Sequence, residues 1–274
     1  MARKKRGRHG KGAAAKADKH SLYQDSVQDP EADLDLAERL FRRFYDRRAR
    51  KLREDFSGTA LMACDWVKRH KENTAWAVDI DPEPLDWGRE HNLSQLNEEQ
   101  ASRVEFMLDD VMVAKCEPVD ITVAFNFSYF LFQTRDELLA YFRKARSTLG
   151  EQGLFMIDVY GGADAQRTMT ENREFDGFEY VWDQHVFDPI TNHVVNYIHF
   201  EFPDGSRIKR AFHYDWRLWS IPELKDILRD AGFSQTDVYW EGTDQKTGEG
   251  SGVYHRSKSA VDDPAWVAYV AAFV

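Results

Sequence analysis

The sequence predicts an α/β protein with a largely parallel sheet of seven strands, helices on both faces of the sheet, and an inserted antiparallel β-meander. Between residues 52 and 160, buried-strand patterns alternate with helical patterns, which indicates βαβ units. Residues 161–217 break this alternation with three strand-like runs joined by turn sequences. The alternation resumes at residue 218, so the insertion divides one α/β domain made of 52–160 and 218–274.

The residues before the first strand predict a tail followed by a helical cover. Residues 1–20 contain eight Lys and Arg and one Asp, a net charge of +7, whereas the remaining chain carries 29 basic and 46 acidic residues, a net charge of −17. We expect 1–20 to be a disordered basic tail. We expect 21–51 to be an N-terminal helical cover, because Leu36, Leu40 and Phe44 follow helical spacing. The acidic body disfavours nucleic acid as a partner, apart from weak contacts of the tail.

Apolar patterns and end signals locate the elements of the α/β domain. Pro82 lies in the first turn of one helix, and Thr134 and Ser220 each form a capping box with the glutamate three residues later. Gly232 ends the last helix. The expected strands are 52–56, 74–81, 104–110, 119–127, 153–160, 235–242 and 266–274, the expected helices are 60–70, 82–92, 134–150 and 220–233, and 243–252 is an expected loop.

The insertion is predicted to be a three-stranded meander that acts as a substrate lid. The runs 178–187, 193–202 and 206–219 are rich in β-branched and aromatic residues, and the segments DPITN and PDG between them favour turns. Because the insertion follows the fifth strand directly, we expect it to fold back over the carboxyl end of the sheet.

Composition excludes several classes of protein. Hydrophobic residues make up 42% of the chain, enough for a sizeable core. The two cysteines rule out a disulfide scaffold and a four-thiolate zinc site. We find neither an apolar run long enough to span a membrane nor a secretory signal, and therefore expect a soluble cytoplasmic protein.

Three acids mark the ends of the first three expected strands. They are Glu54, Asp79 and Asp110, and the turn EDFSGTA after the first strand contains Gly58. Ligands of open α/β sheets bind at this edge, and an acid about 20 residues beyond a glycine turn suits ribose hydroxyls. Asp79 occupies that position, Asp110 suits an adenine amino group, and Ile80 suits the face of the ring.

These motifs together resemble the class I S-adenosylmethionine-dependent methyltransferases, whose sheet is Rossmann-like. EDFSGTA stands where that family has an acid followed by G-x-G-x-G, and AVDIDPEPL, FMLDDVM and VDITVAFNFSYF resemble its next three motifs. The resemblance covers about 53–158 and returns at about 216. Phe56 and Ala60 depart from it, because they replace the first and third glycines.

The resemblance implies a cofactor site for S-adenosylmethionine, which becomes S-adenosylhomocysteine, with no metal. Glu54 and Gly58 would lie at the methionine moiety, Asp79 at the ribose and Asp110 at the adenine amine. Tyr23 would close over the cofactor carboxylate, or else anchor the first helix. The implied cofactor-binding residues are Tyr23, Arg53, Glu54, Gly58, Asp79, Ile80, Asp110, Asn126 and Phe127.

For the methyl acceptor, the resemblance points to small-molecule N-methyltransferases with a lid after the fifth strand. Tyr129, Asp158 and His185 are the expected catalytic residues, and Tyr160, Tyr197 and Arg217 the expected substrate residues. Aromatic residues of the meander would cage a cationic amine or simply pack as its core. They are Tyr180, Trp182, Tyr197, Tyr214 and Trp216.

Two other functions remain compatible with the sequence. One is a protein or RNA methyltransferase that uses the basic tail as a tether, and the other is a noncatalytic interaction module with the same fold. The acidic body disfavours the RNA enzyme, and the intact acid series disfavours the module. A homodimer is compatible with all three.

Overall fold

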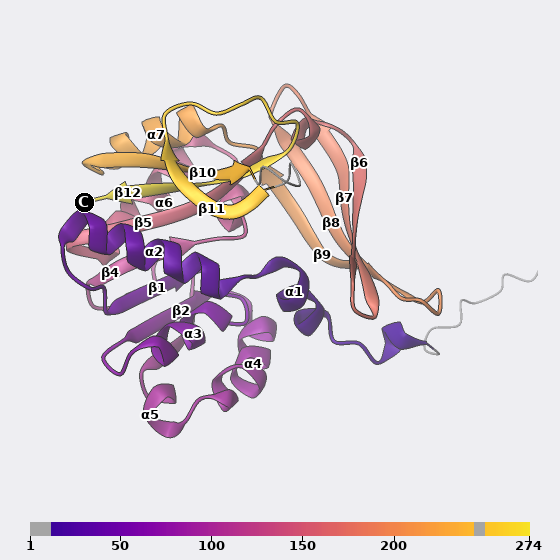
Figure 1. The fold of residues 1–274 in the computed structure, drawn as a ribbon, viewed down its shortest axis with the longest axis horizontal. Coiled ribbons are helices and arrows are strands. Elements are labelled where there is room, and N and C mark those ends of the chain that lie inside the picture. The colour runs from indigo at the N-terminus through magenta and orange to yellow at the C-terminus, as the bar shows by residue number, and fades with distance from the viewer. Residues whose placement is uncertain (1–11, 244–249) are drawn as a thin grey trace, which may run out of the picture. The chain divides into compact units, whose positions relative to one another are not determined.

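The computed structural model describes residues 12–243 and 250–274 and divides into two compact units (Figure 1). The smaller unit combines residues 12–28 with Gln166–Trp216, and the larger unit combines Asp29–Ala165 with Arg217–Val274.

The larger unit is built on an eight-stranded sheet with the order β11-β10-β12-β5-β4-β1-β2-β3. Strands β1 to β5 pair in parallel, whereas β12 pairs antiparallel with both β5 and β10. The strands are β1 (Lys51–Asp55), β2 (Thr74–Asp79), β3 (Val104–Leu108), β4 (Val119–Ala124), β5 (Leu149–Gly161), β10 (Gln235–Thr243), β11 (Gly250–Ser257) and β12 (Trp266–Phe273). This arrangement confirms the predicted fold class.

Helices cover both faces of this sheet (Figure 1). On one face, α2 and α3 bury Phe41 and Trp66 in a core that includes Ile121 and Met156 of the central strands. On the other face, α6 contacts β4, β5 and α7. The helices are α2 (Pro30–Tyr45), α3 (Leu61–Arg69), α4 (Pro82–His91), α5 (Glu98–Ala101), α6 (Arg135–Thr148) and α7 (Ile221–Asp230), with short 3-10 turns η2 (Leu93–Gln95) and η3 (Ser128–Leu131). Both predicted capping boxes are present, at Thr134 and at Ser220.

The eighth strand, β11, corrects the expected loop at 243–252 and the expected count of seven strands. β11 pairs antiparallel with β10 at the edge of the sheet, and most of its side chains are exposed. An exposed edge strand has no apolar alternation to reveal it, and Gly250 and Gly252 in its sequence favour a loop. Residues 244–249 of the expected loop lie outside the described residues.

The smaller unit contains the inserted antiparallel sheet with the order β6-β7-β8-β9. Its strands are β6 (Met169–Phe175), β7 (Phe178–Asp188), β8 (His193–Glu201) and β9 (Arg207–Arg217), and it also contains η1 (Ala13–Ala15), η4 (Asp164–Gln166) at its boundary, and α1 (Lys19–Val27). Three of the strands match the predicted meander. The fourth strand, β6, was not predicted, because this edge strand is mostly polar and exposed.

Residues 12–20 are ordered, so the prediction of a disordered tail is wrong for this segment. The amide of Ala13 donates to a carboxylate oxygen of Asp204 at 2.8 Å. Asp18 caps α1 by accepting from the amides of His20 and Ser21. Leu22 then joins the core of the inserted sheet with Phe178 and Phe200. The low apolar content of the segment concealed this order, although Ala14 and Ala17 also pack against that core. Residues 1–11 of the expected tail lie outside the described residues.

The expected cover 21–51 is not one element either. Its first helix, α1, belongs to the smaller unit, whereas α2 belongs to the larger one.

A substitution that removes the Asp18 cap should destabilise the protein, whereas a disordered tail at 1–20 would tolerate it without effect. Asp18→Ala should lower the free energy of unfolding by about 1 kcal/mol, because two amides of the first turn of α1 lose their acceptor. Asp25→Ala removes the same charge from an exposed position of α1 and should change stability by less than about 0.5 kcal/mol. Urea denaturation of both variants checks this, and equal stabilities would show that the cap contributes nothing.

Candidate functional site

The candidate site lies where the strand order of the larger sheet reverses, between β1 and β4. Glu54 lies near the end of β1, Asp79 ends β2, and Asp110 follows β3. Since these strands are parallel neighbours, their carboxyl ends meet at one edge of the sheet. This edge, at a reversal of strand order, is where open α/β sheets bind ligands.

The turn between β1 and α3 has three left-handed residues at alternate positions. Phe56, Gly58 and Ala60 have φ values of 57°, 53° and 55°. They occupy the three glycine positions of the G-x-G-x-G pattern, so Phe56 and Ala60 keep a glycine-like backbone at a cost in strain. A Cβ added at Gly58 would meet nothing within 4 Å, so the backbone here is open to a close approach by a ligand.

The ring of Phe56 packs against aromatic side chains that follow β4. Its centroid lies 5.4 Å from that of Tyr141 and 6.2 Å from that of Phe132. These contacts compensate for part of the left-handed strain.

Asp79 connects the turn to the next helix. Its two carboxylate oxygens accept from the amide of Gly58 at 2.7 Å and from the amide of Asp81 at 2.9 Å. Burial raises the pKa of Asp79. Ile80 beside it is 69% exposed, an unusual exposure for isoleucine, and leaves an apolar surface beside the acid. The carboxylate of Asp110 accepts from the amide of Met112 and shapes the loop after β3.

Helix α4 supports the turn through a close backbone contact. A Cβ added at Gly88 would lie 2.2 Å from the carbonyl oxygen of Thr59, and the same oxygen accepts from the side-chain amide of Asn92 at 2.9 Å. Only glycine fits at position 88 with α4 at this distance from the turn.

Gly88→Ala should therefore lower the free energy of unfolding by about 1–3 kcal/mol, despite the better helix propensity of alanine. The added methyl group pushes α4 away from Thr59, and the acids at the start of α4 move with it. Gly150→Ala is the matched control, because the nearest atom to its added Cβ lies at 3.7 Å. Denaturation of both variants tests the contact, and a Gly88→Ala variant as stable as the control would show that the turn adapts freely.

The structure contradicts the prediction that Arg53 binds the cofactor, because its side chain is fully buried and does not face the site. The guanidinium donates to Asp55 at 2.7 Å and to the carbonyl oxygens of Val111 and Ala114, both at 3.1 Å. Asp55 also accepts from the hydroxyl of Tyr141. Arg53 thus fastens the loop that carries Asp110 to β1, and the expectation of a direct cofactor ligand is wrong.

Tyr129 and Asp158 also differ from the predicted catalytic roles. Tyr129 is fully buried, and its hydroxyl donates to the carbonyl oxygen of Asp158 at 2.8 Å, so the structure does not support the expected catalytic role of Tyr129. The two carboxylate oxygens of Asp158 accept from the amides of Asn126 and Phe127 at 2.7 and 2.9 Å. Asn126 and Phe127 are left-handed, so Asp158 holds a strained tip after β4. Tyr160, at the end of β5, packs against Phe127.

Sequence reasoning missed a further acid, the half-buried Asp33 in the first turn of α2. Tyr269 of β12 donates its hydroxyl to Asp33, and burial raises the pKa of Asp33 to about 7. Burial and the neighbouring acids raise the pKa of Glu54 to about 8, although the amide of Ala63 donates to it. Burial raises the pKa of Asp158 to about 8 as well, with Asp33 adding to the shift. Asp33, Glu54 and Asp158 therefore form one coupled group of acids. An acid in a helix first turn is an ordinary capping signal, which is why the pattern did not single out Asp33.

Arg217 is engaged by its own unit. Its guanidinium donates to Glu223 at 3.1 Å and to the carbonyl oxygen of Gln133, and it lies 3.8 Å from the ring centroid of Trp219. These contacts fasten the start of α7, so the structure does not support the predicted contact of Arg217 with the substrate.

The inserted sheet separates the expected cage residues onto two faces. Trp182 pairs with Ile198 on the apolar face, whereas Asp183 pairs with Tyr197 on the opposite face. The prediction that these five residues form one cage is therefore wrong. The ring of Tyr197 stacks on that of His213 at 5.0 Å, and His185 lies on the same face and is half-exposed. On the apolar side, Tyr23 packs against Phe212 at 4.7 Å.

Among the residues that the structure describes, no group of three or more His, Cys, Asp or Glu side chains could hold a metal ion. No helix within the described part of the chain is both long and apolar enough to cross a membrane.

Solved structures share this architecture over nearly the whole chain. An S-adenosylmethionine-dependent methyltransferase from Clostridium acetobutylicum superposes with a TM-score of 0.66 at 16% identity, covering 93% of this chain and 97% of its own. CalS10, an amino pentose methyltransferase from Micromonospora echinaspora, gives 0.64 at 12% identity, covering 93% and 96%. KedS8, a sugar N-methyltransferase from Streptoalloteichus, gives 0.62 at 16% identity, covering 99% and 98%.

No protein-family model matches the sequence, and neither does any curated protein. The resemblance found in the sequence is therefore confirmed at the level of fold: the chain has the fold of class I S-adenosylmethionine-dependent methyltransferases.

Proposed function

We propose that this protein is an S-adenosylmethionine-dependent methyltransferase that methylates a nitrogen of a small-molecule acceptor. The observation that carries the proposal is the acid series Glu54, Asp79 and Asp110 around a left-handed turn, at the strand-order reversal of a methyltransferase fold. An acid series at one edge is costly unless it meets a cation or hydrogen-bond donors, and S-adenosylmethionine supplies both.

The residues at this edge fit the cofactor. The open backbone at Gly58 admits the methionine moiety, and Glu54 faces its positive charges. Asp79 accepts from the ribose hydroxyls, Ile80 covers the adenine and Asp110 accepts from its amino group. The strained tip at Asn126 and Phe127, held by Asp158, borders the space where the acceptor meets the methyl group.

S-adenosylmethionine, when bound, supplies an electrophilic methyl group on a sulfonium. The protein's part is to align a neutral amine behind that group and to exclude water, which accounts for most of the rate in a transfer of this kind. We propose that the inserted sheet serves as the lid and that His185 accepts the proton of a protonated amine. Tyr160 and Tyr197 are the proposed acceptor contacts. The sugar methyltransferases among the similar structures suggest an amino sugar as the class of acceptor.

A transfer assay with methyl-labelled cofactor tests the function. The acceptor panel contains amino sugars, simple amines, hydroxyl and carboxylate compounds, a peptide library and total RNA. Label in an amino sugar or amine, with stoichiometric S-adenosylhomocysteine, is the expected result. Label only in peptide or RNA would favour the tethered enzyme. Cofactor binding with no transfer to any member would favour the noncatalytic module.

Cofactor binding itself should depend on Asp79. Asp79→Ala is expected to weaken S-adenosylmethionine about ten- to a hundredfold in calorimetry, because the ribose hydroxyls and the Gly58 amide lose a charged acceptor. Asp86→Ala removes an exposed acid from α4, the helix that follows β2, and should leave the affinity within about twofold. Unchanged affinity in a folded Asp79→Ala variant would contradict the placement of the cofactor.

A further inference from the structure

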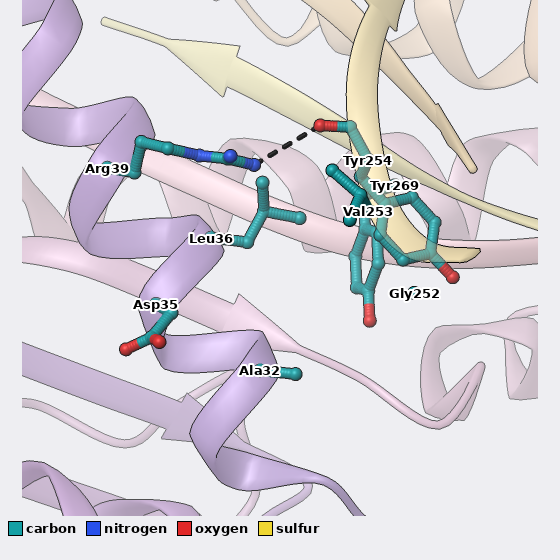
Figure 2. A pocket seen from close by; sticks show the side chains of 8 residues that line it. All are labelled: Ala32, Asp35, Leu36, Arg39, Gly252, Val253, Tyr254 and Tyr269. Atoms are coloured by element: carbon teal, nitrogen blue, oxygen red, sulfur yellow. Dashed lines mark hydrogen bonds between the residues drawn. The ribbon is translucent and has the colours of Figure 1, made fainter. Parts of the chain in front are cut away.

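A separate pocket of about 460 Å³ lies within the larger unit, between α2 and the strands β11 and β12 (Figure 2). This volume is typical of sites for small molecules. The lining residues are Ala32, Asp35, Leu36, Arg39, Gly252, Val253, Tyr254 and Tyr269. None of the proposed cofactor or acceptor residues is among them.

Two tyrosine rings form one wall of this pocket. The centroids of Tyr254 and Tyr269 lie 4.7 Å apart with their planes at 80°, so one ring presents its edge to the face of the other. Leu36 of α2 and Val253 of β11 add aliphatic surface opposite and beside the rings (Figure 2). Flat rings and aliphatic groups of this kind favour a planar, apolar ligand body.

Arg39 provides the charge at the rim. Its guanidinium donates to the carbonyl oxygen of Tyr254 at 3.2 Å, which holds the side chain across the pocket from α2 to β11 (Figure 2). Within 12–243 and 250–274, no carboxylate lies within ion-pair distance of Arg39. Among the described residues that line the pocket, Asp35 is the one acid, and it is already paired with Arg69. The guanidinium of Arg39 therefore has donors to spare, which suits a carboxylate, whereas the nearby acids Asp33 and Glu241 already accept from the hydroxyl of Tyr269 and the amide of Gly252.

We propose that this pocket is a second binding site, and that it takes a small planar aromatic carboxylate. The rings of Tyr254 and Tyr269 hold the ligand body, and Arg39 binds the carboxylate. The lining shares no residue with the proposed acceptor contacts Tyr160 and Tyr197. The proposal stands on the pocket alone and does not depend on methyl transfer.

Calorimetry with three matched probes on the full chain tests the proposal: 2-naphthoate, its neutral amide, and 2-naphthylmethylammonium. We expect 2-naphthoate to bind at least about tenfold more tightly than the other two, since only it forms a charge-assisted pair with Arg39. Arg39→Gln should remove that preference, and Tyr254→Leu should weaken all three probes. Lys225→Gln, which removes an exposed positive charge from α7, should change nothing.

Arg39 is exposed, so its variant should fold normally, and circular dichroism verifies this. Equal affinity for naphthoate and its amide would overturn the proposal. So would an undiminished affinity of the Arg39→Gln variant, because the carboxylate would then bind elsewhere.

Discussion

Replacing Arg53 with methionine is expected to lower the free energy of unfolding by about 3–5 kcal/mol, the cost typical of breaking a fully buried ion pair. Both side chains of the pair are completely buried, and the guanidinium also binds two carbonyl oxygens of the 111–114 segment. Without it, Asp55 keeps only the hydroxyl of Tyr141, and burial raises the pKa of Asp55. The loop that leads from Asp110 loses its attachment to β1 at the same time.

A double variant separates the charge from the packing. Arg53→Met combined with Asp55→Asn removes the stranded acid but keeps an acceptor for Tyr141, so much of the lost stability should return. Guanidinium denaturation of the two single variants and the double variant gives the coupling between the residues. A loss below about 1 kcal/mol for Arg53→Met alone would mean that water or a rearranged loop replaces the guanidinium.

The structural role of Arg53 could not be predicted from the sequence. Its position beside Glu54, in a strand leading to the site, makes it look like a ligand residue. The sequence contains no sign that the segment around Val111 passes over β1, or that its carbonyl oxygens accept from the guanidinium of Arg53. By contrast, Glu54, Asp79 and Asp110 were predictable, because regular alternation of strands and helices brings the ends of parallel strands to one edge.

The missed elements share a physical cause. The strands β6 and β11 lie at sheet edges with exposed side chains, so no apolar periodicity marks them. Residues 12–18 are held by the hydrogen bond from the Ala13 amide to Asp204 and by the Asp18 cap of α1, and Ala14 and Ala17 add only small apolar side chains to the core of the inserted sheet. The hydrogen bond that distinguishes Asp33 from an ordinary first-turn acid comes from Tyr269, which lies 236 residues away in the sequence. Contacts of this range follow from the complete fold and not from a local pattern.

The largest pH effect should come from the coupled acids Asp33, Glu54 and Asp158. Burial raises their pKa values from 3.8 or 4.5 to about 7, 8 and 8. In the folded protein without cofactor these acids hold protons that the unfolded chain releases near pH 4. Because the folded state binds more protons, stability is fully present below the unfolded pKa values and is lost as pH rises through the folded ones. At about 1.4 kcal/mol for each pKa unit, the shift of each acid corresponds to roughly 4 to 6 kcal/mol over this window.

The protein without cofactor should therefore lose at least about 3 kcal/mol of stability between pH 5 and pH 8.5, measured by urea denaturation. Asp33→Asn keeps an acceptor for Tyr269 but cannot ionise, so its profile should be flatter over the same range. Asp25→Asn, at an exposed position of α1, should reproduce the parent profile. Stability that is constant or rises from pH 5 to pH 8.5 would show that the three acids are ionised in the folded protein.

Cofactor binding should reverse this trend if the proposed function is correct. A sulfonium and an ammonium beside Glu54 favour its ionised form, so binding expels protons and the affinity for S-adenosylmethionine should rise with pH through 7 to 8. Calorimetry in buffers of different ionisation enthalpy counts the protons released. S-adenosylhomocysteine lacks the sulfonium charge and should release fewer. Equal proton release by the two ligands would place the sulfonium away from the acids while leaving the stability profile of the free protein as predicted.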